Sequence, residues 1–208
     1  MESAQLMRYG VATLHEAAGR RGILNGIRLL KGDPFAGPAV TVGIPAGDNL
    51  GVHAAIEAAP AGSVVCVASG GRGVYGVLGD LLLEAARARG LAGLVIDDGI
   101  RDLDDLHPPP AVAARGHVPR GTIKARLLTP VGSPVALANV LVRTGDWIVC
   151  DRDGTCVLRA DRLEALATAA EARIVREAGY RERLVAGEPT RVVFGLGFEP
   201  PPTADPSR

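Results

Sequence analysis

The chain has 208 residues, with 23 Lys+Arg against 23 Asp+Glu, so its formal net charge is zero at pH 7. This length suffices for one substantial folded domain, and the balanced charge argues against a polyanionic partner such as nucleic acid. The basic segments "GRRG" at 19–22 and "RGTIKAR" at 120–126 are short and lack interleaved aromatic residues. No apolar signal region or run of 18 apolar residues is present, so we expect a cytoplasmic protein without a membrane partner.

The three cysteines, Cys66, Cys150 and Cys156, all lie in apolar runs. Their spacing matches no zinc motif, and an odd number of cysteines argues against a disulfide framework. We therefore expect reduced thiols in the core of an intracellular protein.

The first half of the chain alternates helical and strand patterns. In chain order we expect a helix at 3–20 with Ser3 as N-cap, a strand at 36–44, a helix at 48–59 capped by Asp48, a strand at 63–69, a glycine-rich loop at 70–79, a helix at 80–90 and a strand at 91–98. The succession of strand, loop, helix and strand predicts a right-handed parallel βαβ unit. The fold class is therefore α/β with a mixed central sheet.

The second half of the chain has a different character. Residues 108–158 predict short strands, including 135–142 and 146–151, with "DRDG" at 151–154 as a hairpin turn. A charged helix is expected at 160–187. We assign residues 1–190 to a single α/β domain and residues 191–208 to a Pro-rich, partly disordered tail.

Two consecutive predicted strands end in sequences that carry chemistry. The loop "GGRGVYGVLGD" follows the strand at 63–69 and leads into a helix that begins at Asp80. The first backbone N–H groups of such a helix, those of Leu81, Leu82 and Leu83, form an anion site for a carboxylate or phosphate. The alternative is that Asp80 only caps the helix. The loop matches neither a P-loop nor a dinucleotide fingerprint.

The second sequence is "DDGIRDLDD" at 97–105, which places five aspartates around Arg101. Asp102 could hold a divalent cation such as Mg²⁺, while Arg101 offers a fixed cationic fork for a carboxylate or keto acid. The alternative is a solvated helix start in which Arg101 pairs with Asp104 or Asp105. Because parallel strands share one sheet edge at their carboxyl ends, the anion site and the Arg–Asp pair should converge.

The segments "PAGDNLGVHAAIEAAPAGSVVCV", "GVLGDLLLEAARARGLAGLVIDDGIRDLDDL" and "GDWIVCDRDGTCVL" resemble the RraA-like proteins over roughly residues 10–185. They are most similar to the branch with 4-hydroxy-4-methyl-2-oxoglutarate aldolase and oxaloacetate decarboxylase activities. Its motif, an Asp, twenty residues, Arg-Asp, two residues and an acid, is met here by Asp80, Arg101, Asp102 and Asp105. Asp98 departs from the pattern, because many relatives have Gly after a single Asp.

The resemblance implies a swivelling β/β/α sandwich with a long C-terminal helix, and a metal-dependent retro-aldol reaction that releases pyruvate. Asp102 would bind Mg²⁺ or Mn²⁺ directly and Asp105 through water. The 2-keto acid substrate would place its carboxylate on Gly79 and the amides of Leu81 and Leu82. Arg101 would stabilise the pyruvate enolate, and Asp80 would manage the proton through a water. These charges lie where negative charge develops in the reaction.

The resemblance also implies a homotrimer or homohexamer with the site at a subunit interface. Glu177, or else Glu171, would reach the neighbour's metal through water, although either could be an ordinary surface acid. The other function class is an RraA-type protein-binding regulator of a ribonuclease without catalysis. A methyltransferase label borne by some relatives has no cofactor fingerprint here.

Several polar residues near these motifs have plain structural interpretations. His53 is expected to be a packed or hydrogen-bonded histidine rather than a base. His117 could lie behind the site. Asn49 is expected to cap a helix, as is Asp48, while Asp97 and Asp98 mark a strand end and Trp147 is expected to be structural.

Overall fold

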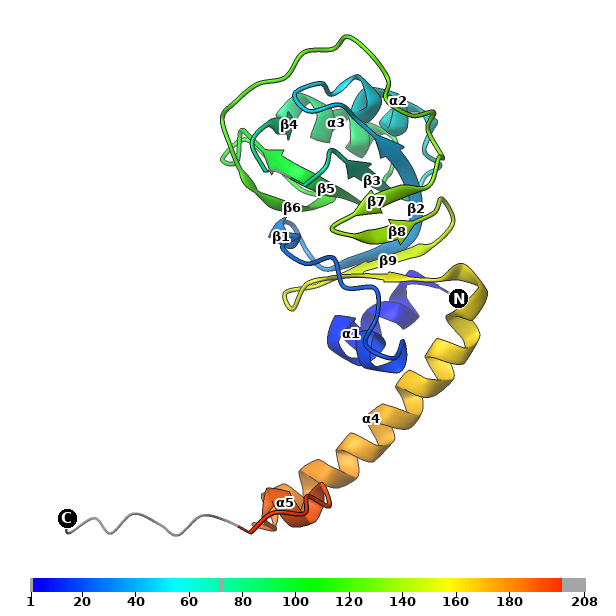
Figure 1. The fold of residues 1–208 in the computed structure, drawn as a ribbon, viewed down its shortest axis with the longest axis vertical. Helices are drawn as coiled ribbons and strands as arrows, with labels where there is room; N and C mark the ends of the chain where they lie inside the picture. Colours follow the sequence, from blue (N-terminus) through cyan, green and yellow to red (C-terminus); the bar gives the residue numbers. More distant parts are fainter. Residues whose placement is uncertain (1, 72, 200–208) are drawn as a thin grey trace, which may run out of the picture.

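The computed structural model describes residues 2–71 and 73–199, and within them the chain forms a curved mixed sheet (Figure 1). The described part of this sheet has eight strands in the order β1-β6-β5-β3-β2-β9-β10, with β4 paired to β5, and β7 and β8 form a separate two-stranded sheet. The strand bounds are β1 Arg28–Lys31, β2 Phe35–Gly43, β3 Val64–Ala68, β4 Gly76–Leu78, β5 Gly93–Ile100, β6 Ala111–His117, β7 Val135–Leu137, β8 Val140–Val142, β9 Trp147–Cys150 and β10 Thr155–Leu158. The helix bounds are α1 Ser3–Ala17, α2 Leu50–Ala58, α3 Asp80–Ala88, η1 Ala160–Arg162, α4 Leu163–Val185 and α5 Thr190–Val193.

The centre of the sheet is parallel. Strands β2, β3, β5 and β6 pair in parallel, whereas β1, β9 and β10 join antiparallel. All five residues of β3 are buried, as expected for a strand covered on both faces. The predicted βαβ unit is therefore confirmed, with α3 between β3 and β5.

Both faces of the sheet are covered. Helices α2 and α3 lie against one face, and their apolar residues join those of β3 and β5 in one core cluster. The β7–β8 sheet packs on the other face in a second cluster. Helix α1 and the first turns of α4 pack beside β9 and β10 in a third. The elements are mixed α/β, and a long C-terminal helix leaves the body, as the sequence predicts.

The stretch 135–142 departs from the prediction of a single strand. Ala138 (φ 45°) and Asn139 (φ 68°) both have left-handed backbone conformations. Two such residues in a row make a tight turn that folds the apolar run into the antiparallel hairpin β7–β8. The hairpin turn predicted at 151–154 is confirmed, because β9 and β10 pair antiparallel with Thr155 opposite Cys150.

Two predicted helix caps are wrong. Glu2 rather than Ser3 precedes α1, and Asn49, not Asp48, holds the N-cap position of α2, as expected for Asn49 alone; neither the Glu2 nor the Asn49 side chain accepts a capping hydrogen bond. The Asp48 carboxylate accepts one hydrogen bond from Leu50 N, at the start of α2, and two from Ala125 N and Arg126 N, which are distant in sequence. Gly10 (φ 74°) breaks α1.

Helix α4 extends away from the body like an arm (Figure 1). Its buried residues, Leu166, Ala167 and Ala170, all lie in the first turns. Beyond these residues the chain turns back after α4, and the short helix α5 packs against it. The rings of Tyr180 and Phe194 meet edge to face there, with their centroids 5.0 Å apart. The predicted boundary between the domain (1–190) and the tail (191–208) therefore falls inside α5. The start of the predicted tail packs against α4 through apolar side chains. Residues 200–208 of the predicted tail lie outside the described residues.

The predicted core thiols are confirmed: Cys66, Cys150 and Cys156 are buried and free. Burial raises the pKa of Cys150 to about 11 and that of Cys156 to about 12. Among the described residues, no helix combines the length and apolar character needed to cross a membrane.

Candidate active site

The N-terminus of α3 lies at the carboxyl end of the parallel strands. Gly79 precedes the helix in an extended conformation and supplies no side-chain cap, so within the described chain Asp80 does not act as the cap. Leu83 N already donates to Gly79 O, at 3.1 Å, which corrects the expectation that its N–H is open. The amides of Leu81 and Leu82 remain outside the helical ladder, and together with the helix dipole they favour an anion.

Arg101 and Asp102 lie directly against this helix start. Arg101 N donates to Leu78 O at 2.9 Å, and Arg101 Nε pairs with Asp102 Oδ2 at 3.3 Å. A Cβ on Gly79 would overlap Asp102 Oδ2 and approach Arg101 Nε to 3.1 Å. Gly79 is therefore needed so that the guanidinium and the carboxylate can pack over the helix start.

Asp102 has a left-handed backbone, with φ 58°, a conformation that Asp tolerates better than most residues. Its carbonyl accepts hydrogen bonds from Asp105 N and Leu106 N, both at 3.0 Å, so the chain turns sharply after Arg101. The alternative of an acidic helix start is wrong, because residues 103–105 form a turn. Arg101 pairs with Asp102 and not with Asp104 or Asp105, both of which are exposed.

The first two acids of the stretch 97–105 belong to the sheet. Strand β5 runs on to Ile100, past the predicted end at 98, and both Asp97 and Asp98 are buried. Asp98 Oδ1 accepts hydrogen bonds from Tyr75 N and Gly99 N. Asp97 pairs with Arg115 at 2.6 Å; burial raises the pKa of Asp97, and Arg115 acts against that shift. Neither acid faces the start of α3 with a free carboxylate.

A small pocket of about 90 Å³ collects most of the predicted residues. It is lined by Gly79, Asp80, Leu81, Leu82 and Arg101, together with Asn49, His53, Gly76, Val77 and Lys124. The volume is well below the roughly 300–1,000 Å³ typical of drug-sized ligands, so it suits a small acid. Asp80 and Arg101 each follow a parallel strand at one sheet edge, as the sequence predicts, and both line this pocket.

Three polar lining residues, Asn49, His53 and Lys124, were not assigned to the site from the sequence. Asn49 is 6% exposed and donates from Nδ2 to Val77 O at 3.1 Å, while its buried Oδ1 has no partner among the described residues. His53 Nε2 is likewise buried and without a partner there. Buried polar atoms are normally satisfied, so these two indicate a ligand or water. The helical spacing of Asn49 and His53 was a signal, but nothing local identified Lys124.

The donor set fits a hard divalent cation held mainly by one carboxylate. Asp102 has a partly exposed side chain, and Asp105 follows in the same turn. Mg²⁺ and Mn²⁺ accept such oxygen ligands and retain several waters. No cluster of three His, Cys, Asp or Glu side chains with metal-binding geometry occurs in the described parts of this single chain. A metal here would therefore depend on Asp102, on water and on groups from outside the chain.

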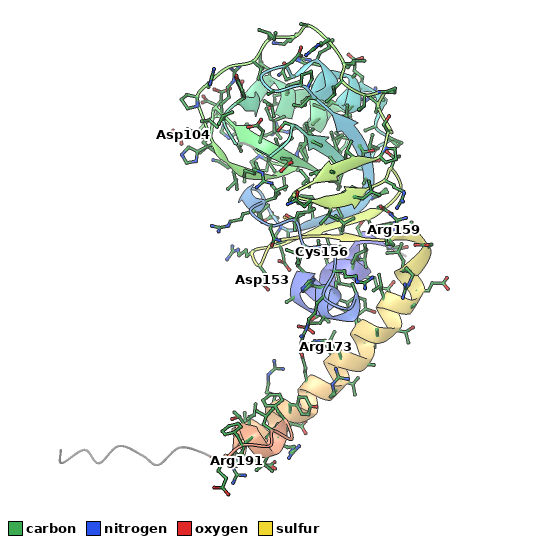
Figure 2. All side chains as sticks on the ribbon, viewed as in Figure 1. Asp104, Asp153, Cys156, Arg159, Arg173 and Arg191 are labelled. Atoms are coloured by element: carbon green, nitrogen blue, oxygen red, sulfur yellow. The ribbon has the colours of Figure 1, made fainter. Side chains whose placement is uncertain are left out.

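The two candidate acids of the C-terminal helix are not in this pocket. Glu177 pairs with Arg173 at 2.7 Å along α4, and Glu171 pairs with Arg8. Figure 2 shows Arg173 on the arm and Asp104 at the far end of the body. Within one chain these acids do not join Asp102. His117 lies opposite Ile100 in the sheet, is exposed, and does not line the pocket.

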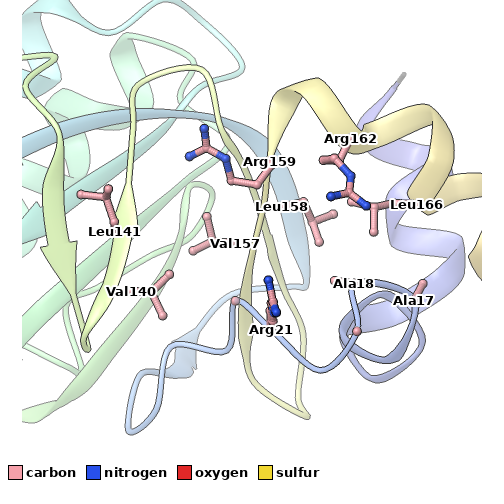
Figure 3. Close-up of a pocket in the computed structure, with 12 residues that line it drawn as sticks. Ala17, Ala18, Arg21, Val140, Leu141, Val157, Leu158, Arg159, Arg162 and Leu166 are labelled. Atoms are coloured by element: carbon pink, nitrogen blue, oxygen red, sulfur yellow. The ribbon is translucent and has the colours of Figure 1, made fainter.

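A larger concavity of about 550 Å³ lies elsewhere, between α1, β8, β10 and the start of α4 (Figure 3). Its lining is apolar apart from Arg21, Arg159 and Arg162. Arg159 is already paired with the buried Asp146 at 2.8 Å. Among the residues that the structure describes, no acid or nucleophile lines this concavity, so size alone does not make it the reactive site.

Fold and pocket together define a mixed α/β protein with an open helix start beside an Arg–Asp pair. The family model described as RraA-like, Aldolase/RraA, matches residues 11–157. The chain belongs to this family.

Individual relatives agree with that assignment. A protein of Halalkalibacterium halodurans with the provisional name 4-hydroxy-4-methyl-2-oxoglutarate aldolase is 36% identical over 136 residues, which cover 62% of each chain. A similarly named protein of Arabidopsis thaliana is 30% identical over 129 residues, covering 61% of this chain and 76% of the relative. The match thus spans less than two thirds of the first relative's length.

Among solved structures, Streptomyces coelicolor RraAS2, described as an unusual member of the RNase ES inhibitor RraA protein family, matches with TM-score 0.76 and 29% identity over 86% of this chain and 96% of that one. A Pseudomonas syringae protein described as uncharacterized matches with TM-score 0.78 and 26% identity, covering 92% and 95%.

Proposed function

We propose that this protein is a divalent-metal-dependent lyase that cleaves 4-hydroxy-4-methyl-2-oxoglutarate-type 4-hydroxy-2-keto acids and releases pyruvate. The observation that carries the proposal is the packing of Arg101 and Asp102 over Gly79 at the open start of α3. Arg101, a permanent cation, lines one small pocket together with Asp80, Leu81 and Leu82, and the Asp102 carboxylate pairs with Arg101 beside that pocket. A 2-keto acid has the matching groups, a carboxylate next to a carbonyl oxygen.

Each residue has a defined role in the proposed reaction. The amides of Leu81 and Leu82 hold the substrate carboxylate. Asp80, through a water, accepts the proton of the C4 hydroxyl while the C3–C4 bond breaks and a carbonyl product leaves. The electron pair of that bond passes to the pyruvate enolate, and Arg101 stabilises the negative charge on its oxygen. Protonation at C3 by the same water then gives pyruvate.

Asp102 would hold Mg²⁺ or Mn²⁺, with Asp105 acting through water. When bound, the cation supplies Lewis-acid stabilisation of the developing negative charge. Arg101, a residue of the chain itself, stabilises the same negative charge. Oxaloacetate would serve as a second substrate, because loss of CO₂ from its C4 carboxylate leaves the same enolate for Arg101 to stabilise.

We further propose that the chain works as a homotrimer or homohexamer. Beyond Ala170 the arm exposes Val175 (67%) and Val185 (83%), which are apolar side chains without a covering layer in the single chain. A neighbouring subunit could cover them, and Glu177 of one arm could then serve the Asp102 site of another subunit.

The direct test is release of pyruvate, coupled to NADH oxidation by lactate dehydrogenase. The substrates are 4-hydroxy-4-methyl-2-oxoglutarate and oxaloacetate, each with Mg²⁺ and with EDTA, and a control without protein corrects for spontaneous decarboxylation. We expect metal-dependent pyruvate release from at least one substrate. Release no faster than the control from both would contradict the proposal.

The second candidate is a protein-binding regulator of a ribonuclease that acts without catalysis. The likeness to RraAS2 over 86% of the chain favours it. A pure binder has no need for the Asp80, Arg101 and Asp102 set. Capture of a purified RNase E-type enzyme in EDTA, with the Arg101→Ala protein binding equally well, would favour this candidate over the lyase.

A further inference from the structure

The segment at residues 119–128, here called the strap, crosses the sheet end without helix or strand, between β6 and β7 (Figure 1). It is nevertheless tied down by backbone hydrogen bonds. Gly76 N donates to Arg120 O at 2.8 Å, and Ile123 exchanges two bonds with the segment before α2, through Gly47 O and Asn49 N. Arg120 also lies over the Tyr75 ring at 4.4 Å. The strap is therefore fixed to the two segments that carry Asn49 and Gly79.

Asp48 anchors the middle of the strap. It is 3% exposed, and its Oδ2 accepts hydrogen bonds from Ala125 N at 3.0 Å and Arg126 N at 2.9 Å. Its Oδ1 accepts one from Leu50 N, which is the largest of the causes that hold the pKa of Asp48 below its usual value. Asp48 thus joins the start of α2 to the residues just after Lys124.

Lys124 is the strap residue that lines the active-site pocket. It is held from both sides, by the Ile123 pairing before it and the Asp48 bonds after it. Burial lowers the pKa of His53, and the charge of Lys124 adds to that shift. In residues 2–71 and 73–199, Lys124 forms no ion pair within 4.0 Å, which leaves its ammonium available to a ligand.

The pocket consequently has two cationic groups of different origin. Arg101 stands at the carboxyl end of β5 beside the open amides of α3, where the keto acid end of a substrate belongs. Lys124 enters from the strap, near Asn49 and His53. A substrate with one carboxylate would satisfy the first group only. A substrate with a second carboxylate, separated from the keto carbon by two further carbons, would satisfy both.

We propose that Lys124 selects 2-oxo dicarboxylates by binding their distal carboxylate, and that Asp48 is the positioning residue that holds Lys124 in place. The proposal rests on the proposed lyase function. It gives the basic segment "RGTIKAR" a role that composition alone did not suggest.

The test compares kcat/KM for 4-hydroxy-2-oxoglutarate, a dicarboxylate, with that for 4-hydroxy-2-oxopentanoate, a monocarboxylate. We expect Lys124→Met to lower the ratio by about 10- to 100-fold, the range for loss of a charge-assisted hydrogen bond. Lys31→Met is the matched control, because Lys31 is the other lysine of the chain and lies in β1. Lys124→Arg should recover part of the ratio.

Asp48→Asn keeps the shape of the side chain but replaces one acceptor with a donor. We expect it to lower the same ratio in the native background and to have little further effect on the ratio in the Lys124→Met background. A purely structural role for Asp48 would lower kcat/KM for both substrates alike and leave the ratio unchanged, which would overturn its positioning role.

The experiment distinguishes a failure of Lys124 selectivity from a failure of the lyase activity. If the native protein cleaves both substrates but Lys124→Met leaves the ratio unchanged, the selectivity proposal is overturned and the lyase stands. If the native protein with Mg²⁺ or Mn²⁺ releases pyruvate neither from these two substrates nor from 4-hydroxy-4-methyl-2-oxoglutarate and oxaloacetate, the lyase itself is overturned, and the selectivity proposal falls with it.

Discussion

The two halves of the stretch 97–105 have nearly the same composition and opposite structural roles. Asp97 and Asp98 lie in β5, buried, with their carboxylates committed to Arg115 and to backbone amides. Asp102 and Asp105 lie beyond the strand end in a tight turn, partly or fully open to solvent. Burial and partners, and not residue type, separate acids that hold the fold from acids that can act on a ligand.

The difference arises from where β5 ends. As long as the chain remains in the sheet, every carboxylate must find internal donors. Beyond the bond from Arg101 N to Leu78 O, the backbone of Asp102 is left-handed, and the side chains of Arg101 and Asp102 lie against the start of α3. The comparison predicts that substitutions in the first half change stability and those in the second half change chemistry.

The largest effect is expected for Arg101→Ala. Loss of the cation that faces the enolate should lower kcat by about 10²- to 10³-fold, the usual cost of removing one preorganised charge-stabilising group. The melting temperature should stay near that of the native protein, since Arg101 is exposed and its ion pair within the described residues is with its neighbour Asp102. Arg152→Ala, in the exposed β9–β10 turn, is the control. An Arg101→Ala protein with native kcat would refute the mechanism.

Asp102→Ala should remove metal dependence together with activity. We expect Mn²⁺ affinity, measured by electron paramagnetic resonance, to fall at least about tenfold, because the direct carboxylate ligand is lost. Asp104→Ala, two residues along the same turn, should bind Mn²⁺ like the native protein. Equal affinity in the two variants would show that Asp102 is not a ligand.

Asp98→Ala tests the buried half. It leaves the N–H groups of Tyr75 and Gly99 without their acceptor inside the protein, and we expect a loss of about 2–3 kcal/mol in the free energy of unfolding. Asp104→Ala should change it by less than about 0.5 kcal/mol, as usual for surface sites. Urea unfolding of both variants measures the difference, and equal stabilities would break the comparison.

Gly79→Ala should act where the two strand ends meet. The added methyl group would overlap the Asp102 carboxylate and crowd Arg101, so both must shift. We expect kcat/KM to fall by about tenfold, since small misplacements of reacting groups are costly. Gly116→Ala is the matched control, because Gly116, like Gly79, has no positive φ and no atom lies within 4 Å of its added Cβ. An unchanged kcat/KM in Gly79→Ala would argue against tight packing at this point.

The smallest effect is expected at the thiols. Because burial raises the pKa of Cys150 to about 11 and that of Cys156 to about 12, both should remain protonated at pH 8. Treatment of the folded protein with a thiol-specific disulfide reagent should therefore label none of the three cysteines, while the urea-unfolded protein should react at all three. Rapid labelling in the folded state would contradict the buried placement.

Much of this could be predicted from sequence because the signals were local. Continuous apolar runs identified β3 and β5, and the shared carboxyl edge of these parallel strands predicted that Asp80 and Arg101 lie close together. The hairpin at 135–142 was missed because its turn uses Ala138 and Asn139 without glycine. Lys124 was missed because its place depends on Asp48, seventy-six residues earlier, through backbone bonds that leave no pattern in the sequence.

The central claim is that Arg101 and the start of α3 stabilise a pyruvate enolate. Exchange of the C3 protons of pyruvate with deuterium oxide, followed by proton NMR, tests it without any choice of aldol substrate. The account predicts exchange that requires Mg²⁺ or Mn²⁺, stops with EDTA, and is lost in Arg101→Ala. Exchange no faster than in buffer with the metal alone would contradict it.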